Sequence, residues 1–164
     1  MTGVQTCALP IYLNKENTLT TCKDSNKLNV ALTPVAVGGD LAKTLGIKPI
    51  YFDLGKYNIR KDAAVELDKI VKVMNENPTM VIELGSHTDC RSSVKFNETL
   101  SANRAKASAA YIKQRITNPE RIYGKGYGES RLLNDCGCEG TVKSTCTEAE
   151  HQLNRRTEFI IIKM

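Results

Sequence analysis

Apolar and polar positions alternate at helical spacing in two long stretches of this chain. Between residues 61 and 77, apolar residues recur at intervals of three and four, which predicts an amphipathic helix ended by Asn77 and Pro78. A second stripe, carried by Ala105, Ala109 and Ile112, predicts a helix over 100–116. Asn97 or Ser101 is its candidate N-cap.

Strand patterns fall on either side of these helices. Short apolar runs predict strands over 50–53, 80–84, 121–123 and 157–162, and a short helix is expected over 148–154. The continuous apolar run 159–162 predicts a strand in the centre of the sheet. This order predicts an α/β (α+β) two-layer sandwich, β-α-β-α-β-(short α)-β, with a mixed sheet and helices on one face.

The first third of the chain has a different character. Residues 2–11 resemble a translated sequencing-library adapter, so we exclude 1–11 from fold reasoning as an artefact. Alternating apolar residues over 28–32 predict one strand, and 12–35 is interpreted as the remnant of an upstream β-rich domain. Three glycines within 36–48, flanked by Pro34 and Pro49, predict a linker with a short helical turn at 41–45, leaving 49–164 as the main domain.

Composition excludes several function classes. The net charge is +5, but the basic residues are scattered and Trp is absent, so we expect no nucleic-acid partner. No apolar run reaches the roughly 18 residues of a membrane span, so we expect membrane contact only through a missing upstream segment. We also expect no cofactor.

The most specific chemical signal is an acid and a base set fifteen residues apart. Asp89 follows a predicted strand in a polar loop, and Arg104 lies just inside the second predicted helix. A carboxylate and a guanidinium fork together can bind a small zwitterion, through its ammonium and its carboxylate respectively. We therefore expect a zwitterionic ligand.

Several motifs around this pair occur together in one known family. Phe52-Asp53, Thr88-Asp89, Asn97-x-x-Leu100-Ser101-x-x-Arg104-Ala105, Gly126-x-Gly128-Glu129 and Asn154-Arg155-Arg156 occur in this order. The stretch 49–164 thereby resembles the OmpA C-terminal-like domain. The approach to the last motif, Glu148-x-Glu150-His151, resembles members from Bacteroidota.

The resemblance implies non-covalent binding of peptidoglycan through the diaminopimelate of its stem peptide. Asp89 would receive the ammonium of the ligand and Arg104 its carboxylate. The same site would be lined by Thr88, Asn97 and Leu100, with Asp53 and Arg155 at its edge. The family further implies a periplasmic location at the outer membrane of a Gram-negative cell, where the domain anchors a protein to the cell wall.

The cysteines allow two kinds of site. Cys136, Cys138 and Cys146 with His151 have the composition of a Cys₃His zinc site, but the C-x-C spacing is tighter than the usual C-x₂-C. Export would favour disulfides instead. We predict that Cys146 pairs with Cys136 or Cys138 and that Cys90 takes the other, with no metal bound.

Two alternative functions stay open at this point. A cell-wall hydrolase would need a nucleophile and base such as Cys90 and His87, or paired acids such as Glu83 and Asp89. No third orienting group accompanies the first pair, and His87 is better interpreted as a structural loop residue than as a metal ligand. We expect no enzyme. A protein-interaction module of the same fold, without wall binding, is the other alternative.

Overall fold

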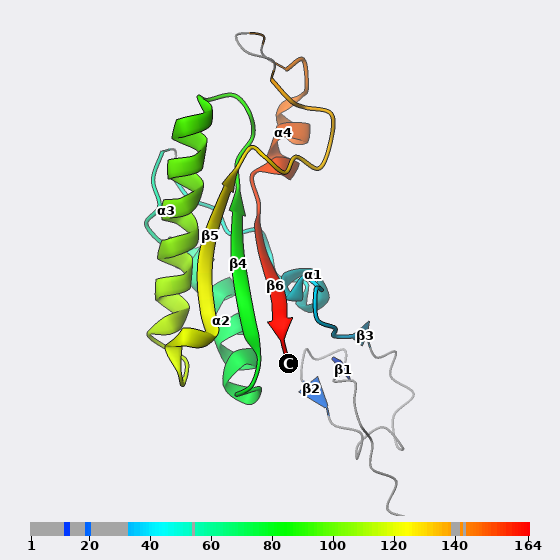
Figure 1. The fold of residues 1–164 in the computed structure, drawn as a ribbon, viewed down its shortest axis with the longest axis vertical. Helices are drawn as coiled ribbons and strands as arrows, with labels where there is room; N and C mark the ends of the chain where they lie inside the picture. Colours follow the sequence, from blue (N-terminus) through cyan, green and yellow to red (C-terminus); the bar gives the residue numbers. More distant parts are fainter. Residues whose placement is uncertain (1–11, 14–18, 21–32, 54, 139–141, 143) are drawn as a thin grey trace, which may run out of the picture.

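The described part of the chain folds around a three-stranded mixed sheet (Figure 1). The structure, a computed structural model, describes residues 12–13, 19–20, 33–53, 55–138, 142 and 144–164. The central strand β4 (Val81–His87) pairs in parallel with β5 (Ile122–Gly128) and antiparallel with β6 (Thr157–Lys163). The predicted mixed sheet and the α/β fold class are therefore confirmed.

Two long helices build the core against one face of this sheet. α2 (Lys61–Glu76) and α3 (Val94–Lys113) contribute Leu67, Ile70 and Ile112, all fully buried. Alternate strand residues such as Ile82 and Phe159 pack against them from the sheet. Every second residue of the strands and every third or fourth residue of the helices therefore belongs to the same core. The next strand residues, Glu83 and His87 among them, point to the other face of the sheet.

α3 lies directly on β5 because two glycines leave room for it. A Cβ built on Gly124 would lie 2.4 Å from the carbonyl oxygen of Ala105, and one on Gly126 would lie 2.2 Å from the backbone nitrogen of Ala102. Both contacts are with backbone and cannot relax by a rotamer change. The strand predicted over 121–123 therefore continues through these glycines to Gly128, and they are the residues that bring the helix close.

Gly126→Ala should therefore lower the free energy of unfolding by about 1–3 kcal/mol or more, because α3 must move off the sheet. Urea denaturation measures this loss. Gly137→Ala is the matched control, since its new methyl group would meet its nearest neighbour, Leu132 Cδ1, at 3.8 Å. Equal stability of the two variants would contradict the close-packing argument.

The predicted first strand, 50–53, is not a strand. Ile50 is buried, but the segment is irregular and no described strand pairs with it. Nearby backbone groups bond to side chains instead: the Lys48 N–H donates to Glu66 at 3.0 Å, and the Asp53 carbonyl accepts from Arg104 at 3.4 Å. Tertiary side-chain contacts thus replace a strand ladder here.

The second helix begins earlier than predicted. Ser93 is the N-cap of α3, and its hydroxyl accepts a hydrogen bond from the Phe96 N–H at 3.3 Å. Asn97 and Ser101, the predicted caps, both lie inside the helix. Ser101 Oγ accepts from the Gly128 N–H at 2.8 Å, so this side chain bonds to β5 rather than capping its own helix.

The segment 36–48 is part of the folded unit, so the linker prediction is wrong. It contains the predicted helical turn, α1 (Leu41–Leu45), whose Leu41 is fully buried. Asp40 caps α1 and also accepts the Phe159 N–H at 3.0 Å. The strand β6 lies at the edge of the described sheet rather than in its centre, and α1 packs beside it (Figure 1).

The remaining elements agree with or lie outside the predictions. α4 (Glu148–Asn154) follows a 3₁₀ turn, η1 (Pro119–Arg121), and β5 along the chain, and it has the predicted bounds. A second sheet is formed by β1 (Tyr12–Leu13), β2 (Leu19–Thr20) and β3 (Thr33–Pro34). The strand predicted over 28–32 lies outside the described residues. Within the described part of the chain, no helix has the length and apolarity needed to cross a membrane.

Candidate functional site

A cavity of about 670 Å³ opens beyond the carboxyl end of β4. Its walls come from four parts of the chain: the loop after β4, the first half of α3, the irregular segment around Phe52, and α4. Six of the seven predicted ligand residues line it: Thr88, Asp89, Asn97, Leu100, Arg104 and Arg155. The fold thus brings together residues that are far apart in the sequence, such as Thr88 and Arg155, which are separated by 67 positions.

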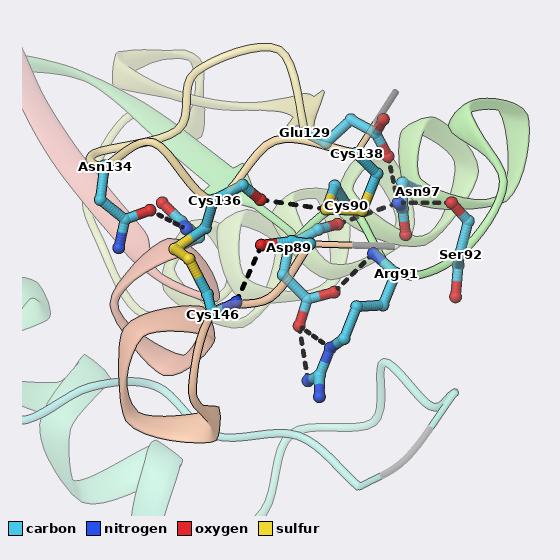
Figure 2. The surroundings of a disulfide bond; sticks show 12 residues. Asp89, Cys90, Arg91, Ser92, Asn97, Glu129, Asn134, Cys136, Cys138 and Cys146 are labelled. Carbon is cyan, nitrogen blue, oxygen red and sulfur yellow. Dashed lines mark hydrogen bonds and ion pairs between the residues drawn. A yellow bond between two sulfur atoms is a disulfide. The ribbon is translucent and has the colours of Figure 1, made fainter. Parts of the chain in front are cut away.

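The loop that carries Asp89 is held on both sides by hydrogen bonds. The Thr88 N–H donates to the Gly128 carbonyl at 2.8 Å, and the Asn97 amide donates to the Asp89 carbonyl at 2.9 Å. Figure 2 shows the same amide group directed also at Glu129 and Ser92. Asn97 is almost fully buried and its amide donors are in use, so it positions the loop.

The Asp89 carboxylate is already paired with two arginines. Its Oδ2 accepts from Arg91 at 2.7 and 3.1 Å and from Arg155 at 2.6 Å. Burial by itself would raise the pKa of Asp89, but the hydrogen bonds from Arg91 and Arg155 outweigh it, and the pKa lies below its usual value. Asp89 is therefore a charged group at neutral pH.

Arg104 contacts a backbone carbonyl and an aromatic ring. Its Nε donates to the Lys56 carbonyl at 3.1 Å, and its guanidinium lies over the Phe52 ring, 5.0 Å from the centroid. Among the described residues, no carboxylate lies within salt-bridge distance of it. Burial and then the charge of Arg155 lower its pKa from the usual value, which still leaves the group cationic at neutral pH. The cavity therefore holds an uncompensated positive charge.

Asp53 is the predicted site residue that the cavity does not include. Its carboxylate forms an exposed ion pair with Arg60 at 3.1 Å, and only its backbone carbonyl contacts Arg104. The side chain therefore contributes less directly than the resemblance implies.

α4 supplies one wall that sequence reasoning found only in part. Glu148, Gln152 and Arg155 follow one another at spacings of four and three and line the cavity together. The helix starts with a capping box, in which Thr147 and Glu150 satisfy each other's backbone N–H groups. The spacing identifies the shared face, but only the fold shows that this face meets Asp89.

Other cavity residues were not predicted at all. Arg91, Phe96 and Phe52 line the cavity together with Asp89 and Arg104. Arg91 follows Asp89 by two positions, which places its side chain within reach of the carboxylate, and this proximity was the available signal.

Two disulfides join the walls of the cavity (Figure 2). Cys136 pairs with Cys146, and Cys90 pairs with Cys138, which selects one of the two predicted pairings. Their sulfur atoms are bonded to each other, so the zinc alternative is wrong for this state of the protein. The chain of covalent links runs from Asp89 through Cys90 and Cys138 to Cys136 and Cys146, two residues before Glu148.

The two residue pairs considered for catalysis, Cys90 with His87 and Glu83 with Asp89, are not arranged to act together in this fold. Cys90 is oxidised, and the His87 side chain is fully buried and stacked on Tyr127 with ring centroids 5.1 Å apart. Glu83 bonds to the Tyr127 hydroxyl and does not line the cavity that contains Asp89. Neither pair of residues can therefore act on a ligand in this cavity.

Thr88 provides an independent sign of a binding site. Its residue is nearly fully buried, it lines the cavity, and its Oγ1 has no hydrogen-bond partner among the described residues. A buried hydroxyl without a partner costs free energy, which a bound ligand with a polar group recovers.

His87 ends β4 just before this loop and lies beside a carboxylate on β6. His87 Nε2 is 3.3 Å from Glu158, which also pairs with Arg156 at 2.7 Å. The His87 contact, followed by that of Arg156, lowers the pKa of Glu158 to about 2 despite burial. A carboxyl group with a lowered pKa stabilises the fold above its unfolded pKa, near 4.5, and this stabilisation is lost as the pH falls towards 2.

Glu158→Gln should accordingly be less stable than wild type at pH 6, and the difference should shrink as the pH falls from 5 to 2. Urea unfolding at a series of pH values measures it. Glu98→Gln, on the exposed surface of α3, should show a smaller difference at pH 6. A difference for Glu158→Gln that stays constant with pH would rule out the linkage.

Comparison with known proteins identifies the chain's relatives. The model of the OmpA family matches residues 51–144, which is more than half of the chain. The chain belongs to the OmpA family. The peptidoglycan-associated lipoprotein of Rhizobium meliloti is 30% identical over 87 residues, covering 53% of this chain and 49% of that protein. Another relative, named photosystem I P700 chlorophyll a apoprotein A2 of Gloeobacter violaceus, is 33% identical over 112 residues, covering 68% of this chain and 12% of that protein.

A solved structure supports the fold of this OmpA-family domain. The peptidoglycan-associated lipoprotein from Burkholderia pseudomallei superposes with a TM-score of 0.58 at 19% identity, covering 71% of this chain and 92% of that one. The chain spans less than two thirds of the length of the curated relatives named above.

Proposed function

We propose that this domain binds peptidoglycan non-covalently, through the diaminopimelate residue of the stem peptide. The observation that carries the proposal is the cavity shared by Asp89 and Arg104, in which the guanidinium pairs with no carboxylate of the described residues. A carboxylate of the ligand supplies the missing negative charge, and the ligand's ammonium is attracted to Asp89. Membership of the OmpA family and the similarity to the peptidoglycan-associated lipoprotein of Rhizobium meliloti support the same partner.

The proposed ligand fits the other features of the site. Thr88 Oγ1 offers a hydrogen bond, and Phe52 and Leu100 provide apolar surface for the methylene chain of diaminopimelate. Each ion pair in such an open site is worth about 1 kcal/mol, or more where a bidentate guanidinium is partly buried. We therefore expect modest affinity for one stem peptide, and retention on the polymer by avidity when several domains act together.

We infer a periplasmic location, facing the cell wall at the outer membrane. The two disulfides support an oxidising compartment, and the peptidoglycan-associated relative supports proximity to the wall. Anchoring of a longer protein to the wall would follow from binding alone, without catalysis.

Binding to isolated sacculi tests the proposal. The purified domain is mixed with diaminopimelate-type sacculi, and bound protein is measured after sedimentation, in parallel with calorimetry against a soluble stem peptide. We expect retention and competition by the peptide. Absence of both would leave the protein-interaction module as the function, whereas release of soluble muropeptides would indicate a hydrolase.

A further inference from the structure

Four charged groups beside the cavity form a closed ring. Arg91 bridges Asp89 and Glu148, with its Nη2 2.7 Å from the first carboxylate and its Nη1 2.6 Å from the second. Arg155 bridges the same two acids from the other side. Two carboxylates and two guanidiniums thus neutralise one another.

The two arginines of the ring already bond to Asp89 Oδ2, the carboxylate oxygen that would bind the ammonium of a ligand. Asp89 Oδ2 accepts three N–H groups from Arg91 and Arg155, and Oδ1 accepts the backbone N–H of Arg91 at 3.2 Å. A carboxylate offers about four lone-pair sites, so little capacity is left. An incoming ammonium must therefore compete with a guanidinium for Asp89.

Arg91 is the arginine that can give way. Its side chain is 40% exposed, against 23% for Arg155, whose guanidinium also bonds to Gln152. Arg91 has an alternative partner, because Glu148 is 68% exposed and can follow it toward solvent. A movement of the Arg91 side chain toward solvent breaks its side-chain hydrogen bonds to Asp89 and keeps its ion pair with Glu148.

We propose that Arg91 takes the position at Asp89 that the ammonium of the ligand needs, and that Glu148 holds Arg91 when the ligand displaces it. This inference rests on the proposed function and adds a source of specificity to it. Only a cationic group of the ligand can replace the ion pair that Asp89 loses when Arg91 moves away. A ligand with a carboxylate alone gains Arg104 but leaves the ring closed. The ring thereby selects a zwitterion over a simple acid.

Two substitutions should shift affinity in opposite directions. Arg91→Gln removes the competitor, so the diaminopimelate stem peptide should bind roughly two- to fivefold more tightly, the equivalent of one partly exposed ion pair. Glu148→Gln removes the second partner of Arg91, so the same peptide should bind more weakly by a similar factor. Calorimetry at fixed ionic strength measures both, and thermal unfolding confirms that each variant is folded.

A second ligand separates competition from general charge effects. With the distal amine of diaminopimelate acetylated, Arg91→Gln should bring no gain in affinity, because no ammonium enters the ring. Arg115→Gln is the charge-matched control, since Arg115 lies against Tyr111 at the other end of α3. The side-chain Nε–H resonance of Arg91 should move on addition of the unmodified peptide and not of the acetylated one.

The outcomes distinguish this inference from the proposed function. If wild-type protein binds neither sacculi nor peptide, the proposed function itself fails. If wild type binds and Arg91→Gln binds equally or more weakly, Arg91 is no competitor and the inference is overturned. An equal gain for Arg115→Gln would also overturn it, because the effect would then come from net charge.

Discussion

Arg104→Ala should reduce binding of the stem peptide roughly tenfold to a hundredfold and release the domain from sacculi. The guanidinium is half-buried, lies over Phe52 and has no carboxylate partner among the described residues, so its charge is available to the ligand. A hydrogen bond to a charged group contributes about 1.5–3 kcal/mol, which corresponds to this loss. Sedimentation with sacculi and calorimetry with the peptide provide the measurement.

Matched variants show which property of Arg104 accounts for the loss of peptide binding. Arg104→Lys keeps the charge but loses the planar fork, so we expect intermediate affinity. Arg115→Ala, at the far end of α3, should bind like wild type. Asp89→Asn should also weaken binding, because it removes the charge that attracts the ammonium. Full retention of both Arg104→Ala and Asp89→Asn would refute the assignment of the cavity.

Removing the disulfides should have the largest effect on stability. Cys90–Cys138 joins residues 48 positions apart, and Cys136–Cys146 joins residues 10 apart. The loss of loop-closure entropy predicts about 4 kcal/mol of stabilisation for the first and about 3 kcal/mol for the second. Replacing both cysteines of either pair by serine should lower the free energy of unfolding in this order, as measured by urea denaturation.

The same substitutions should weaken ligand binding, because the two disulfides connect Asp89 to the start of α4. Without Cys90–Cys138, the loop that carries Asp89 is held by its hydrogen bonds to Asn97 and Gly128 and by its ion pairs with Arg155 and Glu148. Paired serine substitutions are preferable to a reductant, since Cys7 and Cys22 are also present in the chain. A folded Cys90→Ser, Cys138→Ser double variant with unchanged peptide affinity would contradict this role.

Much of the fold was predictable because its signals are local. The spacing of apolar residues identified α2 and α4 with their bounds, and the motif around Asp89 and Arg104 identified the cavity before its walls were known. The start of α3 was missed because Asn97 and Ser101 are typical cap residues. Both side chains bond instead to residues of the β4 loop and β5, a choice that local spacing does not encode.

The sequence by itself determined the elements, the family and the charges that the cavity contains, because each depends on residues close together in the chain. Only the tertiary structure decided that 50–53 forms no strand and that 50–52 lines the cavity, that Cys90 pairs with Cys138, and that Arg91 forms an ion pair with Asp89. The physical reason is that these contacts join distant segments or depend on side-chain geometry. The sequence alone allows several contact partners for these residues. Burial, the packing of α3 on the glycines of β5 and the ion pair of Arg91 with Glu148 determine which contacts form.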